Sequence, residues 1–468
     1  MRRLRRALET ATVGVAAAVA GLTVMVPIDP TVGVSQESSA WVDLAVFNVP
    51  RATLAAAFVT VLAAVCIVMA SDAVGWVVVA LGAGGLLIDQ VLWSNEVGSQ
   101  SLLTWIDSVL AGMLMGTVGT LAWHRRSTAS AFLFGAMSGI LVGDFTPAPA
   151  PGHAPSRLDR FLLDTPTIGL TALLVVAAGV CALGLRHRAA VVRKLVDVIP
   201  LRPVVVAGIV FPTILLTSEW FARNGRDLRV LILGVLVLVL VSVVGAFILP
   251  GRDGVLLLLL VAYAAAGSTP VTVPRPDWAV LLFVAMVGSG LATGYRRGLP
   301  LIAAGLTALL AAASIVTVLT GAHGTFTAVV SGMAVAFVGG YCLGAATPLF
   351  PSVPPLCIAV LFVPSAAVAL WGRDFDRIAY SPSWYRPAEP AHAIAPGLVA
   401  LAITVGCAAG IALVCRVRPR TKEAIRDRWA RMQADSVHPG AMTFADGRLP
   451  AYLTPRRDAA SWTRRSRV

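Results

Sequence analysis

The feature that most constrains the fold of this chain is a succession of fourteen apolar runs, each long enough to cross a bilayer as a helix. When the intervening loops are assigned alternately to two sides, 27 of the 37 Lys and Arg residues share the side of the N-terminus. The 24 acidic residues divide the opposite way, nine and 15, so the two sides carry net charges of +18 and −5. Because Lys and Arg accumulate in cytoplasmic loops, this division predicts an all-α polytopic membrane protein with both termini in the cytoplasm. The runs are 10–28, 52–70, 73–93, 104–123, 129–147, 166–185, 203–220, 230–249, 255–273, 278–295, 299–320, 325–346, 354–372 and 394–415.

Composition excludes a soluble globular protein, because 57% of the residues are hydrophobic and only 13% are charged. Fourteen spans leave room for short loops and one tail, and for no sizeable soluble domain. All six cysteines lie within or at the ends of apolar runs, where they predict small buried side chains and no disulfide framework. Arg outnumbers Lys 35 to 2, and Ala, Val and Gly are abundant, which indicates a high-GC bacterial genome. We therefore expect the chain in a bacterial inner membrane.

The chain divides into four parts. Residues 1–185 carry the first six spans, residues 203–415 carry eight more, and 416–468 form a basic, polar, partly disordered tail on the cytoplasmic side. The link between Arg186 and Arg202 repeats apolar residues at helical spacing with basic residues between them, which predicts an amphipathic helix on the cytoplasmic leaflet. The expected partners of the link and of the tail are anionic lipid headgroups. Other membrane proteins are further candidates, and nucleic acid is not expected.

Motifs that would supply chemistry are missing from the sequence. It has no phosphate-binding loop, no zinc-protease motif, no nucleophile elbow and no Cys/His cluster with metal-ligand spacing. We therefore expect no ATPase activity of its own, no metal and no cofactor. No charged residue falls near the middle of a span, which argues against an ion pathway built on deep carboxylates and leaves shallower acids as candidates.

Four acids occupy the outer ends of apolar runs and are the candidate substrate-binding residues: Asp89, Asp107, Asp144 and Glu219. Arg223 follows Glu219 by one helical turn and is a candidate partner for it. If the bundle brings the three aspartates together, they line a negatively charged outer vestibule that binds a cationic substrate or takes up a proton. The alternative is that each acid is simply solvated at the interface, as residues at span ends often are.

Two prolines lie inside apolar runs, Pro212 in the seventh and Pro364 in the thirteenth. Proline lacks the N–H that a helix interior needs, and transporters use such helix breaks to coordinate substrates. Membrane helices also tolerate proline without any function, when neighbouring groups satisfy the freed carbonyl. Both prolines are therefore candidate helix breaks, either as part of a substrate site or without a function.

Glycines repeat every four residues in three of the runs, which puts them on one face of a helix. A face of small residues lets another helix approach closely, so these repeats predict tight helix packing within the chain. The repeats are Gly112 and Gly116, Gly135, Gly139 and Gly143, and Gly340 and Gly344.

Three classes of function fit these observations. Fourteen spans around a basic central link are similar to extended members of the major facilitator superfamily, although the turn at Asp72 and Gly75 lacks the basic residues of that family's loop. The resemblance is therefore one of span count. We favour a transporter or a lipid or drug exporter without its own ATPase. The alternative is a non-catalytic membrane subunit of a cell-envelope or secretion assembly. A membrane glycosyltransferase with an outer-face acid such as Asp29 or Asp43 is less favoured. We therefore favour a protein that is not an enzyme.

Overall fold

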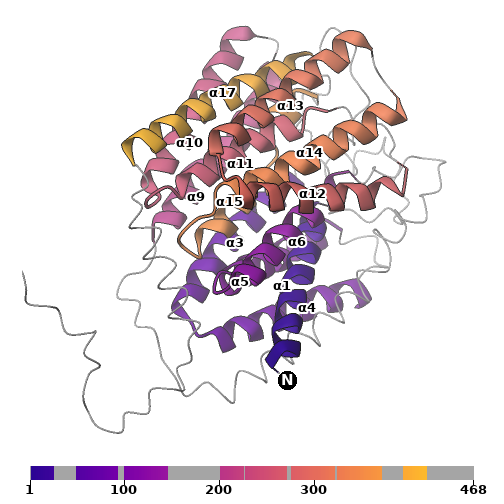
Figure 1. The fold of residues 1–468 in the computed structure, drawn as a ribbon, viewed down its shortest axis with the longest axis vertical. Helices are drawn as coiled ribbons and strands as arrows, with labels where there is room; N and C mark the ends of the chain where they lie inside the picture. The colour runs from indigo at the N-terminus through magenta and orange to yellow at the C-terminus, as the bar shows by residue number, and fades with distance from the viewer. Residues whose placement is uncertain are drawn as a thin grey trace, which may run out of the picture. The chain divides into compact units, whose positions relative to one another are not determined.

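The computed structural model describes residues 2–25, 49–92, 100–145, 201–225, 227–270, 276–321, 324–371 and 394–418 (Figure 1). All regular secondary structure in these residues is helical, and eleven of their helices are long and apolar enough to cross a membrane. The chain is thus a multi-pass helical membrane protein. The helices are α1 (Arg2–Met25), α3 (Val49–Met69), α4 (Asp72–Leu92), α5 (Gln100–Ala122), α6 (Arg126–Asp144), α9 (Leu201–Asn224), α10 (Leu228–Ile248), α11 (Gly254–Gly267), α12 (Ala279–Arg296), α13 (Pro300–Thr320), α14 (Thr325–Ala345), α15 (Val353–Ala359), η2 (Val360–Phe362), α16 (Ala366–Trp371) and α17 (Ile394–Val417).

The predicted count of fourteen spans stays a prediction. Within the described residues, α6 is long enough to cross but is not among the eleven, because Ser, Thr and Gly lower its hydropathy. Helix α11 has only 14 residues and ends at Gly267, short of the predicted boundary at 273, since Ser268 and Pro270 follow it. The predicted span 166–185, the amphipathic link up to residue 200 and the tail from residue 419 lie outside the described residues. The division into four parts is therefore a prediction as well.

Three helix pairs pack most closely, and they are the pairs that carry the glycine repeats. Helix α6 packs on α1, α5 on α3, and α14 on α12. A Cβ atom added at Gly139 would collide with the backbone carbonyl of Ala18 on α1. Gly116 and Gly340 lie in the same way against the carbonyls of Thr60 and Val287. The prediction that the repeats pack helices together within the chain is confirmed.

The most deeply buried helices are α11 and the segment Val353–Leu370. Nearly every residue of α11 is buried, and it contacts α10, α13, α14 and α17. A helix that is apolar all round belongs in the interior, whereas α10 leaves one face of Leu, Ile and Val exposed, as a lipid-facing helix does. All of the helices named above belong to one compact unit, Met1–Pro419.

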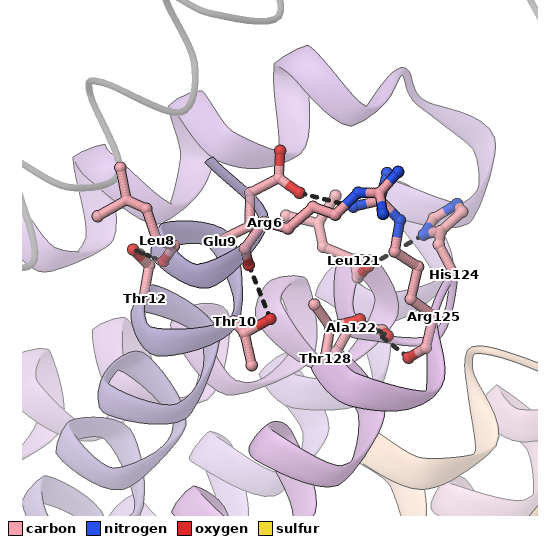
Figure 2. Close-up of polar contacts among 10 residues, drawn as sticks. All are labelled: Arg6, Leu8, Glu9, Thr10, Thr12, Leu121, Ala122, His124, Arg125 and Thr128. Atoms are coloured by element: carbon pink, nitrogen blue, oxygen red, sulfur yellow. Dashed lines mark hydrogen bonds and ion pairs between the residues drawn. The ribbon is translucent and has the colours of Figure 1, made fainter. Parts of the chain in front are cut away.

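Polar contacts tie together loops that the alternation assigns to the N-terminal side, here called the inner side. Glu9 of α1 forms an ion pair of 3.0 Å with Arg125, in the turn between α5 and α6 (Figure 2). The indole of Trp123, in the same turn, donates to the carbonyl of Pro348 after α14 at 3.3 Å. The carboxylate of Asp253, between α10 and α11, accepts backbone N–H groups of Leu349 at 2.8 Å and Phe350 at 3.1 Å.

The contact between Trp123 and Pro348 bears on the predicted topology. Seven described helices lie between these residues along the chain, and seven crossings would put them on opposite sides of the membrane. The predicted span 166–185 would make the number even. We therefore expect a topology reporter fused after residue 153 to read as external and one fused after residue 188 as cytoplasmic. Reporters that give the same side at both positions would contradict the predicted sixth span.

Candidate functional site

The thirteenth predicted span is interrupted near its middle. Helix α15 ends at Ala359, and the short helix η2 that continues it ends at Phe362. Val363 is extended (φ −87°, ψ 128°), and helix α16 begins only at Ala366. Pro364 lies in this gap and cannot donate a backbone hydrogen bond. The hydroxyl of Ser218 on α9 lies 2.8 Å from the Pro364 carbonyl and satisfies it. Ser365 accepts the backbone N–H of Val368 at 3.3 Å and so caps α16.

The interruption faces a small cavity. A partly open volume of about 60 Å³ lies between the ends of α1, α6 and α11, helix α14 and residues 361–368. Asp144 at the end of α6 lines it, together with Tyr263, Ser268 and Ser365. The Ser268 and Ser365 hydroxyls are 2.7 Å apart, and the Tyr263 hydroxyl donates to the Val335 carbonyl at 3.2 Å. The remaining lining is apolar, so one acid and three hydroxyls meet in an otherwise apolar pocket.

The depth of this cavity follows from helix geometry. Asp144 is the last residue of α6, which begins at Arg126 on the inner side. At 1.5 Å per residue, the carboxyl group lies about 27 Å from that side, near the far edge of a hydrocarbon core about 30 Å thick. If α6 crosses the membrane, the cavity therefore lies in the half away from the N-terminal side, where the sequence predicts the candidate acids.

The structure brings together some of the candidate residues and not others. Asp144 and Pro364 line one cavity, although about 220 residues separate them in the chain. Asp89 on α4 and Asp107 on α5 lie close together, and neither lines the Asp144 cavity. A single vestibule lined by all three aspartates is thus not formed among the described residues.

The candidates on α9 stand apart from both sites. Glu219 is half-buried and Arg223 is exposed, and no ion pair joins them within the described part of the chain. Helix α9 continues on both sides of Pro212, so this proline does not end the helix as Pro364 does. The hydroxyl of Thr213 donates to the Ile209 carbonyl at 2.6 Å, one of the local bonds that maintain α9 around the proline.

Sequence reasoning missed the hydroxyl groups of the cavity. Ser and Thr are frequent in apolar helices and usually bond to a carbonyl of their own helix, so Ser268 carried no signal. Tyr263 lies in an apolar run without a motif and carried none either. Ser365 had one, because a serine directly after a proline that breaks a helix is a preferred cap for the next helix. Over the described ranges, no group of three His, Cys, Asp or Glu side chains is placed to hold a metal ion.

Comparison with known proteins adds little to this geometry. No family model matches the chain, and no curated protein matches it. One similar solved structure is titled "Crystal structure of auto inhibited POT family peptide transporter", with 12% sequence identity and a TM-score of 0.39. The similarity covers 96% of this chain and 99% of that one. A likeness of this degree shows no shared family, so the function must be inferred from the residues of this chain.

Proposed function

We propose that this chain is a membrane transporter without an ATPase of its own, and that the Asp144 cavity is part of its pathway. The observation that carries the proposal is the meeting of Asp144, three hydroxyl groups and the helix break at Pro364 in one cavity within the membrane. Ionisable side chains that face a cavity within a bundle of membrane helices commonly mark substrate or ion pathways. Interrupted helices are a recurrent way for transporters to build a binding site in a bilayer.

The size of the cavity limits what it holds in this conformation. One water molecule needs about 10–15 Å³ of cavity volume on this measure, so about 60 Å³ accommodates a few water molecules or one small cation. A lipid or a drug-sized molecule does not fit until the surrounding segments separate. Residues 363–365 are not helical and provide the place where such a movement requires least rearrangement. We propose an amphipathic or lipophilic cation as the substrate class, because the lining is apolar apart from one acid and the hydroxyl groups.

The proposal is tested by efflux of a fluorescent lipophilic cation, ethidium, from vesicles that contain the purified protein. We expect Asp144→Asn to lower the efflux rate by tenfold or more, because it removes the only acid that lines the cavity among the described residues, while the amount of folded protein stays the same. Asp277→Asn is the matched control, since Asp277 is an outer-side acid that does not line this cavity. Efflux by Asp144→Asn at the rate of the unaltered protein would rule out this site.

The alternative function remains a non-catalytic membrane subunit of an envelope or secretion assembly in a bacterial inner membrane. Purification in mild detergent, with mass spectrometry of everything that is retained, separates the two. We expect recovery of the chain alone with bound lipid or small molecule. Stoichiometric protein partners together with absence of efflux would replace the transporter by the assembly subunit.

A further inference from the structure

The segment 353–362, which consists of α15 and η2, is completely enclosed by the rest of the protein. Every one of its residues is buried. The candidate span that contains it, Val353–Leu370, is buried over its whole length, whereas the other candidate spans of the described residues are buried over at most 67% of their apolar stretch. A helix that borders lipid leaves one face exposed, so this segment has no lipid-facing side.

The segment lies between helices from both halves of the chain. It contacts α3 and α5 from the first half, and α9 and α11 from the second. A Cβ atom at Gly119 on α5 would collide with the ring of Pro355, so α5 and α15 touch closely there. At the other end of the segment, Leu361 and Phe362 form part of the wall of the Asp144 cavity. The segment therefore fills the space between this cavity and the inner side.

Two non-helical stretches join the segment to the rest of the chain. Residues 363–365 lie at its outer end, and residues 346–352, here called the inner loop, lie at its inner end. A helix bounded by two such stretches can change position as one body, because only a few residues at its ends need new φ and ψ angles. The segment contains no charged residue, so its movement breaks no ion pair of its own.

Hydrogen bonds from two different parts of the fold hold the inner loop. The indole N–H of Trp123, in the turn between α5 and α6, donates to the Pro348 carbonyl at 3.3 Å. The carboxylate of Asp253, at the start of α11, accepts the backbone N–H groups of Leu349 at 2.8 Å and Phe350 at 3.1 Å. Asp253 is only 2% exposed, and its side chain does not cap α11, as an aspartate in this position commonly does. The carboxylate is thus engaged in fixing the inner loop.

We propose that the segment 353–362 is a movable plug between the Asp144 cavity and the inner side, and that Trp123 and Asp253 form the latch that holds it. When the latch bonds are released, the inner loop leaves the turn between α10 and α11, and the plug swings about residues 363–365. The cavity then opens toward the inner side. The proposal rests on the transport function proposed above and extends it by naming the part of the chain that moves.

The test measures how fast N-ethylmaleimide modifies Cys357 in the purified full chain in lipid nanodiscs, by mass spectrometry of the cysteine-containing peptides. Cys357 is fully buried and lies four residues after the start of α15, about 6 Å along the helix axis. We expect Asp253→Ala to raise the rate of its modification at least tenfold, because the carboxylate that accepts both N–H groups is lost. Trp123→Phe keeps an aromatic ring but loses the indole N–H, and should raise the rate by a smaller factor. If Asp253→Ala fails to fold, Trp123→Phe still tests the latch.

Two controls separate release of the plug from a general loosening of the protein. Cys407 on α17 is as deeply buried as Cys357 and should keep its rate of modification in both latch variants. Asp227→Ala is the matched substitution, because Asp227 also accepts a backbone N–H, that of Arg229 at 2.9 Å, but at the opposite end of α10. This variant should leave Cys357 at its original rate.

Two results would overturn the proposal. One is a Cys357 that reacts at its original rate in both Asp253→Ala and Trp123→Phe. The other is an equal rise at Cys357 and Cys407, which would show that the variants loosen the whole bundle. The labelling involves no transport, so its outcome is separate from that of the efflux assay. Loss of efflux in Asp144→Asn with an unreactive Cys357 in both latch variants would keep the cavity and reject the plug, whereas unchanged efflux with a reactive Cys357 would reject the cavity and keep the movable segment.

Discussion

Replacing Gly139 with leucine is expected to unfold or strongly destabilise the protein. The α1–α6 pair is among the closest in the structure, and a Cβ atom at Gly139 would lie only 2.9 Å from the Cα atom of Ala18. The obstructing atoms are backbone, so they cannot rotate away as a side chain can, and the two helices must separate along their whole contact. Overpacking of a core costs about 1–3 kcal/mol where side chains yield, and we expect at least the upper end of that range here. The midpoint of thermal unfolding in detergent measures the loss.

Alanine substitutions at Gly139 and at Gly305 provide the control. Gly139→Ala adds one methyl group against the Ala18 carbonyl and should lower the unfolding midpoint. Gly305→Ala on α13 meets nothing within 4 Å and should leave the midpoint unchanged or raise it, since alanine is the better helix former by about 0.5–1 kcal/mol. Equal effects at the two positions would show that α1 and α6 do not pack through this glycine.

The sequence predicted the helices better than it predicted their interruptions. Apolar runs mark helices because a lipid-facing backbone must satisfy its own hydrogen bonds, and this constraint acts locally. The average hydropathy of such a run does not show where the helix within it is interrupted. Hydropathy makes the run 354–372 one span, and only Pro364 within it indicates the interruption at residues 363–365, which are not helical. The predicted run 255–273 likewise extends past the end of α11 at Gly267. Ser268, Thr269 and Pro270 lower the average hydropathy of the run too little to show where the helix ends.

The two acid sites differ in how far the sequence could have predicted them. Asp89 lies four residues before the end of the predicted run 73–93, and Asp107 lies three residues after the start of the predicted run 104–123. Residues at similar distances from the connection of an antiparallel helix pair lie side by side. That pairing was accessible from spacing alone. Asp144 and Pro364 meet because α6, α11 and the segment Val353–Leu370 converge, and no periodicity relates residues so distant in the chain. The predicted vestibule of three aspartates assumed that acids at equal depth are neighbours, which depth alone does not ensure.

Replacing Arg418 with alanine is expected to detach the end of α17 from the turn between α10 and α11. The Arg418 guanidinium donates to the carbonyls of Leu249 at 2.6 Å, Gly251 at 2.7 Å and Phe247 at 2.8 Å, and lies 5.6 Å from the centre of the Phe247 ring. Arg252 in turn donates to the carbonyls of Cys415 at 3.1 Å and of Arg418 at 2.6 Å.

Each arginine thus satisfies carbonyl groups at the C-terminal end of the other helix. Those carbonyls have no partner in their own helix, and the negative end of the helix dipole favours a cation beside them. Hydrogen bonds to charged groups contribute about 1.5–3 kcal/mol each when buried. Because Arg418 is half-exposed and its three bonds are not additive, we expect Arg418→Ala to cost about 2 kcal/mol in total and Arg418→Lys to cost less. Thermal unfolding of both variants and of Arg252→Ala measures these costs, and an unchanged midpoint in Arg418→Ala would contradict the capping role.

This arrangement determines where the basic tail must be cut to test its function. Deleting residues 416–468 removes Arg418 as well, so loss of function after that deletion would follow from loss of the helix caps alone. Deleting residues 420–468 keeps Arg418 and the whole of the compact unit that contains the helices. We expect the shorter deletion to unfold at the temperature of the full chain and to transport ethidium at the same rate, whereas the longer one should unfold as early as Arg418→Ala. If the shorter deletion keeps its stability and loses function, the tail binds a partner that the function needs, and the assembly subunit becomes the better explanation.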